Sequence, residues 1–164
     1  CMKQVIVIRH AKSSWTDASQ SDFDRPLNER GKRDAPAMAQ RLLQKQFIMD
    51  AFITSAANRA QTTAGIFAAA INPQAAFIIT ENLYLAPSAT FYQLIKDIDN
   101  AFTTVAIFAH NPGITDFVNT LTQYRTDNVP TCGMFAVSSN ANTWSQFAES
   151  EKQFLFYDYP KLGN

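Results

Sequence analysis

Short runs of β-branched and aromatic residues alternate with longer segments that carry apolar residues at helical spacing, and this alternation most strongly restricts the possible folds. We expect strands at residues 5–8, 51–54, 76–80, 104–109, 134–138 and 154–159. We expect helices at residues 28–45, 59–70, 88–98 and 114–121. Because strands that alternate with helices build a mostly parallel sheet with helices on both faces, we predict a three-layer α/β/α domain.

The last two expected strands differ from the others, because no long helical segment separates them. Only a loop or a short helix around Trp144 lies between them. The pattern leaves open whether residues 154–159 form an inner strand or an edge of the sheet. The chain shows no repeat, low-complexity tract or linker, so we expect one domain over residues 1–164, in which 46% hydrophobic residues suffice for one core.

The charged residues are balanced, with 14 Lys and Arg against 14 Asp and Glu. A nucleic-acid-binding domain usually carries a basic excess, so we expect no nucleic-acid partner. The longest apolar stretch, residues 66–71, is far shorter than the ~20 residues of a membrane span. The apolar run at residues 5–8 is too short for the core of a signal peptide. We therefore expect a cytoplasmic protein without a membrane partner.

Cysteine and histidine are both rare, which limits the chemistry that the chain can perform. Cys1 and Cys132 are the only cysteines and no C-x-x-C pair exists, so neither a zinc site nor a disulfide framework is indicated. Two histidines without clustered carboxylates also make a poor ligand set for a metal hydrolase. We expect no metal and no cofactor, and any histidine chemistry must use His10 or His110.

Polar residues follow each of the first four expected strands. Arg9 and His10 follow the first, Arg59 follows the second, Glu81 the third and His110 the fourth. In an open α/β sheet the ligand crevice lies beyond the carboxyl ends of the parallel strands. Both histidines of the chain are therefore predicted at the carboxyl end of one sheet.

Several phosphate chemistries are excluded by pattern. The P-loop motif is absent, and five glycines leave little material for a phosphate-cradling loop. A cysteine phosphatase loop needs Arg six positions after its Cys, but Ser138 stands there after Cys132. Asp22 and Asp24 do not follow a strand, as an aspartyl-phosphate nucleophile would, and no G-x-S-x-G elbow is present.

A histidine nucleophile among arginines remains. Neutral imidazole attacks phosphorus without losing a proton, and guanidinium groups match the charge and geometry of phosphoryl oxygens. Arg9 adjoins His10, Arg59 stands at the start of a helix whose dipole favours anions, and a protonated His110 would complete the cluster. Glu81 could protonate the leaving oxygen and later accept a proton from water.

Residues 5–13 resemble the signature of the histidine phosphatase (phosphoglycerate mutase-like) superfamily. Within it, the chain is similar to the short SixA-type phosphohistidine phosphatases. The similarity extends over nearly the whole chain, through residues 9–15, 24–31, 55–63, 81–84 and 109–113 in the same order. The resemblance implies a phosphoglycerate mutase-like α/β fold.

The resemblance also implies roles for individual residues. His10 is the residue that would be phosphorylated in a covalent intermediate. Arg9, Arg59 and His110 would bind the transferring phosphoryl group. Arg25 looks like the further arginine that SixA-type members bring to the pocket.

Other positions are less clearly matched. Glu81 lies in the region of the family's proton donor, which is variable in SixA-type members, and Ser13 either adds a hydroxyl to the phosphate or caps its loop. Ala11 replaces the glycine that is usual in the signature. The chain lacks long lid insertions, so we expect an open pocket with Trp15 and Tyr84 near its mouth or simply packed on the surface.

Our hypothesis is a metal-independent phosphatase that acts through a phosphohistidine intermediate. Its substrate would be a phosphorylated protein, in particular a phosphohistidine protein, or a small phosphate ester. A sugar-phosphate phosphatase or mutase-like enzyme is one alternative, and a non-catalytic phosphate-binding module is another. The sequence leaves the physiological substrate and the oligomeric state open.

Overall fold

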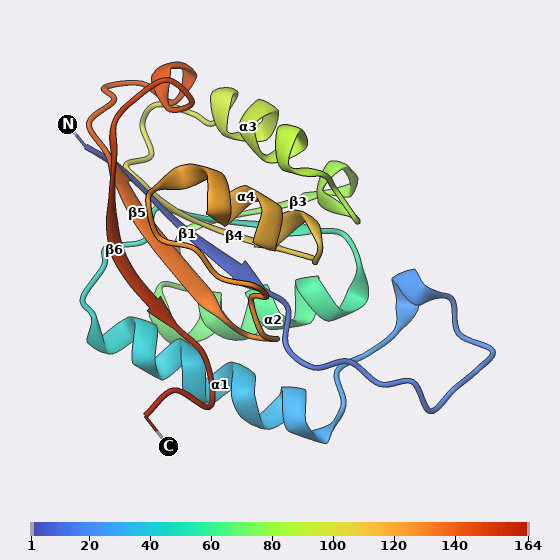
Figure 1. The fold of residues 1–164 in the computed structure, drawn as a ribbon. Coiled ribbons are helices and arrows are strands. Elements are labelled where there is room, and N and C mark those ends of the chain that lie inside the picture. The colour runs from blue at the N-terminus through green and yellow to red at the C-terminus, as the bar shows by residue number, and fades with distance from the viewer. Residues whose placement is uncertain (1, 164) are drawn as a thin grey trace.

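The strands of the protein form one mixed sheet at the centre of the molecule (Figure 1). The structure is a computed structural model that describes residues 2–163, so Cys1 and Asn164 lie outside the described residues. Within that range the sheet has six strands in the order β3-β2-β4-β1-β5-β6. Their bounds are β1 Lys3–Arg9, β2 Ala51–Ser55, β3 Ala76–Thr80, β4 Thr104–Ala109, β5 Met134–Ser139 and β6 Lys152–Asp158.

The first four strands are parallel and the last two are antiparallel. β1 pairs in parallel with β4, and β2 pairs in parallel with both β3 and β4. β5 lies antiparallel beside β1, and β6 lies antiparallel beside β5. Among the described strands β6 pairs with β5 alone, so the segment left open by the sequence is an edge strand. The predicted mostly parallel α/β sheet is confirmed.

Helices cover both faces of the sheet, which confirms the predicted three layers. α1 Glu29–Gln44 and α2 Asn58–Ile71 lie on one face, and α3 Ser88–Lys96 and α4 Gly113–Leu121 lie on the other (Figure 1). The chain steps from β1 to β2 to β3 in one direction along the sheet and then returns to β4. Because crossovers between parallel strands are right-handed, this reversal moves the helices to the opposite face.

Alternate residues of β1 enter two separate cores. Val5 and Val7 pack on the side of α3 and α4, where Phe117 is fully buried. Ile6 and Ile8 pack on the side of α1 and α2. A strand covered on both faces needs apolar residues at successive positions, which explains the continuous β-branched run that marks it in the sequence.

The segment between β1 and α1 returns to the end of β1. Asn28 caps α1 by accepting the Gly31 N–H at 2.9 Å, and the Asn28 N–H donates to the Lys12 carbonyl at 3.0 Å. A Cβ on Gly31 would lie 2.1 Å from the same Lys12 oxygen, so only glycine permits this approach. The short helix η1 Asp22–Asp24 lies in this segment, and its Asp22 and Asp24 carbonyls accept hydrogen bonds from Arg59 and Asn58 at the start of α2.

Two further short helices complete the described chain, η2 Glu81–Leu83 directly after β3 and η3 Trp144–Gln146 between β5 and β6. In the part of the chain that the structure describes, every helix is too short or too polar to cross a membrane.

Candidate active site

His10 and His110 lie side by side at the carboxyl end of the sheet. β1 and β4 are neighbours in parallel register, with Arg9 opposite Ala109, so the residue after each strand emerges at the same level. The centroids of the two imidazole rings are 5.1 Å apart. His10 is 7% exposed and His110 is 2% exposed. The structure therefore brings both histidines together, as the sequence predicts.

The hydrogen bonds of His10 identify its tautomer. Nδ1 lies 2.7 Å from the Ala11 carbonyl oxygen, which can only accept, so Nδ1 carries the proton. Nε2 then presents a lone pair, and it accepts the Nε–H of Arg59 at 3.3 Å. Burial lowers the pKa of His10 well below its usual value, against the effect of the Ala11 hydrogen bond and together with the nearby positive charges. His10 is thus a neutral imidazole with its nucleophilic nitrogen facing a guanidinium group.

Arg59 is held in the first turn of α2, where the sequence predicts a phosphate-binding arginine. Its side chain is almost fully buried, and its Nη1 donates to the Asp22 carbonyl oxygen at 2.6 Å. Its Nη2 contacts the Asp22 carboxylate at 3.0 Å. The Thr63 hydroxyl accepts the Ala11 N–H and donates to the Arg59 carbonyl, which ties α2 to the residue after His10.

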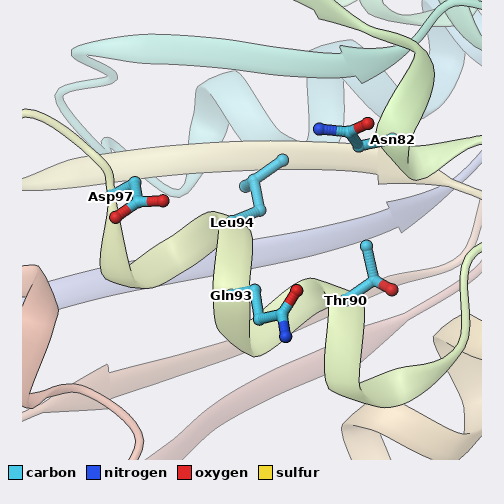
Figure 2. Close-up of a pocket in the computed structure, with 5 residues that line it drawn as sticks. All are labelled: Asn82, Thr90, Gln93, Leu94 and Asp97. Carbon is cyan, nitrogen blue, oxygen red and sulfur yellow. The ribbon is translucent and has the colours of Figure 1, made fainter.

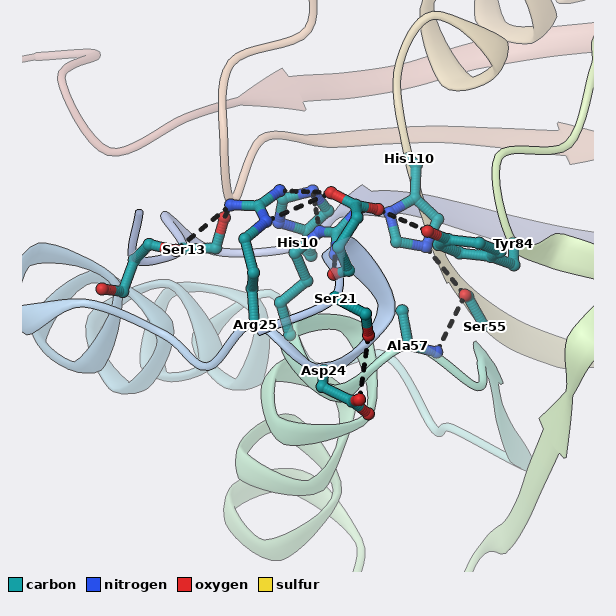
Figure 3. A network of polar contacts seen from close by, with 12 residues as sticks. His10, Ser13, Ser21, Asp24, Arg25, Ser55, Ala57, Tyr84 and His110 are labelled. Carbon is teal, nitrogen blue, oxygen red and sulfur yellow. Dashed lines mark hydrogen bonds and ion pairs between the residues drawn. The ribbon is translucent and has the colours of Figure 1, made fainter. Parts of the chain in front are cut away.

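His110 has one ring nitrogen engaged and one free among the described residues. Its Nε2 lies 2.7 Å from the Ser55 hydroxyl, which already accepts the Ala57 N–H (Figure 3). The Ser55 proton can therefore bond to Nε2, and Nδ1, which is buried without a partner in residues 2–163, can carry the hydrogen. Burial, with the charge of Arg59 next in size, lowers the pKa of His110 to about 3. With this lowered pKa His110 is neutral near pH 7, so it can join the cluster as an N–H donor without being protonated.

Arg9 lines the same end of the sheet. Its Nη1 donates to the Val129 carbonyl at 2.9 Å, and its Nε is buried without a hydrogen-bond partner in the described chain. Burial and the neighbouring charge of Arg59 lower the pKa of Arg9. Two guanidinium groups close enough to affect one another favour an anion between or beside them.

Arg25 reaches the site from the segment before α1. Its Nη1 donates to the Ser13 hydroxyl at 2.5 Å, and its guanidinium carbon lies 3.5 Å from the centroid of the Trp15 ring. Figure 3 shows His10 between Arg25 on one side and His110 and Tyr84 on the other. Ser13 therefore contacts Arg25 and orients it. Trp15 is 72% exposed, and its ring covers the guanidinium of Arg25.

Asp22 is a site residue that sequence reasoning missed. Its carboxylate contacts Arg25 at 2.9 Å and Arg59 at 3.0 Å, and it accepts the hydroxyl of Tyr84. Partial burial acts to raise the pKa of Asp22, but the hydrogen bonds from Tyr84, Arg25 and Arg59 hold it well below its usual range. The residue lies three positions before Arg25, and that spacing was the one signal in the sequence that could have linked it to the site.

Tyr84 is the second group whose contacts could not be foreseen. It follows η2, and its ring lies edge-on to His110, with centroids 5.5 Å apart. Burial and the Asp22 carboxylate raise the pKa of its hydroxyl, which therefore stays protonated and donates to Asp22. From the sequence, we expected Tyr84 either near the mouth of an open pocket or simply packed on the surface, with no assigned partner.

Glu81 lies at the edge of this cluster. It is the first residue of η2 and is exposed, and its side chain makes no hydrogen bond or ion pair with another residue in the range 2–163. Its carbonyl accepts the Tyr84 N–H at 3.0 Å. The structure therefore links Glu81 to the site through the backbone and leaves its carboxyl group in solvent.

A separate surface pocket of about 540 Å³ lies over α3 (Figure 2). It is lined by Asn82, Thr90, Gln93, Leu94 and Asp97. None of these is one of the clustered histidines or arginines. Across residues 2–163, no group of three or more His, Cys, Asp and Glu side chains is arranged to hold a metal ion.

The cluster around His10 therefore combines one nucleophilic nitrogen, three guanidinium groups and two neutral donors. This combination suits an anion that carries several oxygens and reacts at its centre, as a phosphoryl group does.

Comparison with known proteins agrees with this geometry. Residues 5–84 match the family model of the histidine phosphatase superfamily (branch 1). An uncharacterized protein of Mycobacterium leprae is 30% identical over 94% of this chain and 100% of its own length. An uncharacterized chloroplastic protein of Arabidopsis thaliana is 25% identical over 88% of this chain and 70% of its own.

Solved structures show the same fold. A SixA protein from Agrobacterium tumefaciens superposes with a TM-score of 0.83 at 22% identity, over 96% of this chain and 98% of that one. The protein histidine phosphatase SixA in complex with tungstate superposes with a TM-score of 0.81 at 19% identity, over 96% of this chain and 97% of that one. A mycobacterial glucosyl-3-phosphoglycerate phosphatase in complex with VO3 superposes with a TM-score of 0.73 at 13% identity, over 96% of this chain and 99% of that one. With its sequence match, its fold and its paired histidines taken together, the chain belongs to the histidine phosphatase superfamily.

Proposed function

We propose that the protein is a metal-independent phosphatase that transfers a phosphoryl group to His10 and then to water. The observation that carries the proposal is the state of His10. Its Nδ1–H is engaged by the Ala11 carbonyl, and its Nε2 lone pair lies beside the guanidinium of Arg59. This is the protonation state that a histidine nucleophile requires.

In the first step, Nε2 of His10 attacks phosphorus in line with the leaving group, and the bond from phosphorus to that group breaks. Arg9, Arg25 and Arg59 supply positive charge to the phosphoryl oxygens, and His110 supplies an N–H. The attack places positive charge on the imidazole, and the Ala11 carbonyl that accepts from Nδ1 stabilises it. Positioning and charge account for most of the rate in such a transfer.

In the second step, water attacks the phosphorus of phospho-His10, its proton passes to the group that acted as the acid in the first step, and the P–N bond breaks, which restores neutral His10. A proton must reach the leaving group in the first step, and we assign it to Glu81 or a substitute acid. An imidazole leaving group reduces the demand for a strong acid. A phosphohistidine protein is therefore the substrate that best suits the exposed position of Glu81.

The fold likeness to SixA structures and the lack of a large lid insertion support an open site for a phosphorylated protein or a small phosphate ester. We extend the proposal to one histidine phosphatase domain over residues 1–164, placed in the cytoplasm, without a nucleic-acid or membrane partner. A sugar-phosphate phosphatase is the second candidate, because the glucosyl-3-phosphoglycerate phosphatase shares the fold. A non-catalytic binding module is disfavoured, because His10, Arg59 and His110 are all present.

The decisive experiment is a search for the covalent intermediate. The protein is mixed with a phosphate monoester, quenched in base and analysed by mass spectrometry for an acid-labile, base-stable phosphoryl adduct on His10. Because the chain has only two histidines, His10→Ala, which must give no adduct, is the variant that distinguishes His10 from His110 as the adduct site. A screen of a phosphohistidine protein beside sugar phosphates then separates the two substrate classes. Turnover without any adduct on His10 would refute the mechanism.

A further inference from the structure

The carboxylate of Asp22 lies among the donors that surround the proposed phosphoryl site. Its Oδ1 accepts from Nε and Nη2 of Arg25 at 3.1 and 2.9 Å. Its Oδ2 accepts from Nη2 of Arg59 at 3.0 Å and from the Tyr84 hydroxyl. Two guanidinium groups and one hydroxyl thus converge on a single anionic group.

These donors are tied directly to the nucleophile. The same Arg59 guanidinium that holds Asp22 through Nη2 donates through Nε to Nε2 of His10. Tyr84 packs its ring edge against His110. An anion that meets these donors therefore lies next to the nitrogen that would attack it.

Carboxylate and phosphoryl oxygens compete for the same kind of partner. The fork formed by Nε and Nη2 of Arg25 is a bidentate contact that either group can accept. A phosphoryl dianion carries more charge and more acceptor oxygens than a carboxylate, so it matches the arginine cluster better.

The side chain of Asp22 is also placed so that it can move away from these donors. Its side chain is 39% exposed, and it belongs to the three-residue η1 helix in the long segment between β1 and α1. Its neighbour Asp24 has a different partner, since its carboxylate accepts only from the Ser21 hydroxyl among the described residues. Among the described residues, the Asp22 carboxylate makes its hydrogen bonds and ion pairs with Arg25, Arg59 and Tyr84.

We propose that Asp22 occupies part of the phosphoryl site and that an incoming phosphoryl group displaces its carboxylate and takes over Arg25, Arg59 and the hydroxyl of Tyr84. Tyr84 is then a further binding residue of the phosphoryl group, and Asp22 is an internal competitor that sets how tightly the site holds an oxyanion. This inference rests on the proposed function, because it takes the cluster around His10 as the phosphoryl site.

The test measures the binding of inorganic vanadate by isothermal titration calorimetry, in the wild type and in three variants. Asp22→Asn keeps the size of the side chain and removes its charge, and we expect vanadate to bind at least about tenfold more tightly, because the competent state becomes more populated. Tyr84→Phe removes one donor, and we expect binding about tenfold weaker. Asp24→Asn removes the same charge from the same short helix but leaves the donors to Asp22 unchanged. The affinity of this variant for vanadate should stay within about twofold of that of the wild type.

The two variants are expected to change the affinity for vanadate in opposite directions, and this makes the test specific. Asp22 and Tyr84 contact each other, so a purely structural contact would weaken binding in both variants. Unchanged or weaker binding in Asp22→Asn overturns the displacement, and unchanged binding in Tyr84→Phe overturns its role as a donor. Thermal unfolding checks that each variant is folded.

A crystal structure of the wild type with vanadate provides a test that needs no variant. We expect vanadate on Arg59 and Tyr84, with the Asp22 carboxylate moved away, and retention of its contacts to Arg25 and Arg59 overturns the inference. Vanadate binding needs no turnover, so this result is separate from the proposed function. A protein that shows these affinities but no phosphatase activity refutes the function alone.

Discussion

Arg59 and His10 are joined by a hydrogen bond in which the guanidinium Nε–H donates to the imidazole Nε2 at 3.3 Å. This contact connects residues 49 positions apart in the sequence. It holds the lone pair of the nucleophile beside the charge that would stabilise a transferring phosphoryl group.

Replacing His10 with Ala should abolish turnover. The variant removes the nucleophile while the arginines stay, so we expect kcat for a phosphate monoester to fall by roughly 10³-fold or more. Steady-state assays at saturating substrate measure this. Thermal unfolding shows whether the variant is folded, and activity close to that of the wild type would contradict the assignment of His10.

Replacing Arg59 with Lys should separate charge from geometry. Lys keeps a positive charge but cannot contact His10 and an oxyanion at once through a planar fork, so we expect kcat/KM to fall by about 10²-fold. Arg33→Lys is the matched control, because Arg33 is exposed on α1. Equal activity of the two variants would show that charge alone is needed at position 59.

Acid should destabilise the protein through its histidines. Burial lowers the pKa of His110 to about 3 and that of His10 below its usual value, whereas both take up protons near pH 6.5 when unfolded. Below that pH the unfolded state binds more protons, so the free energy of unfolding decreases by up to ~1.4 kcal/mol per pH unit for each histidine as the pH falls from 6.5 toward 5.

Urea unfolding at pH 7.5, 6 and 5 measures this dependence, in a range above the titration of ordinary carboxylates. In the variant His110→Asn, the slope of the free energy of unfolding against pH should be about half of that in the wild type. A slope that is unchanged in this variant would show that His110 titrates normally.

Two glycines should respond to alanine in opposite directions. A Cβ at Gly31 would lie 2.1 Å from the Lys12 carbonyl oxygen, so Gly31→Ala should destabilise the protein by about 1–3 kcal/mol or more and shift the start of α1. Gly65 lies within α2, with nothing within 4 Å of an added Cβ, so Gly65→Ala should stabilise by about 0.5–1 kcal/mol. Chemical denaturation gives both values. A neutral or stabilising Gly31→Ala would contradict the close packing at Lys12, and a destabilising Gly65→Ala would contradict the open space at Gly65.

Glu81→Gln should affect substrates according to their leaving groups. If Glu81 protonates the leaving oxygen, the variant will slow a substrate with a poor leaving group, such as an alkyl phosphate, more than an aryl phosphate or a phosphohistidine. Glu29→Gln, on the exposed start of α1, provides a control for loss of charge. Equal slowing of all substrates would argue against the acid role.

The sequence by itself determined the positions of the helices and strands and the end of the sheet at which the histidines meet. The apolar run at residues 5–8 is followed by Arg9 and His10, and the run at residues 104–109 is followed directly by His110. Neighbouring parallel strands end at the same end of the sheet. Hydrophobic periodicity and the Asn28 cap are local properties, which is why the strand and helix positions could be predicted from the chain alone.

Only the tertiary structure decided which groups contact the nucleophile and in which state. Tyr84 meets Asp22 across 62 positions, through a turn and a long segment that have no periodic pattern. Burial depends on every element that packs around a side chain, so the neutral state of His110 and the tautomer of His10 could not be read from their neighbours in sequence. The pattern of apolar residues specifies the sheet, whereas the charge and hydrogen bonding of the site arise from segments that the sheet brings together.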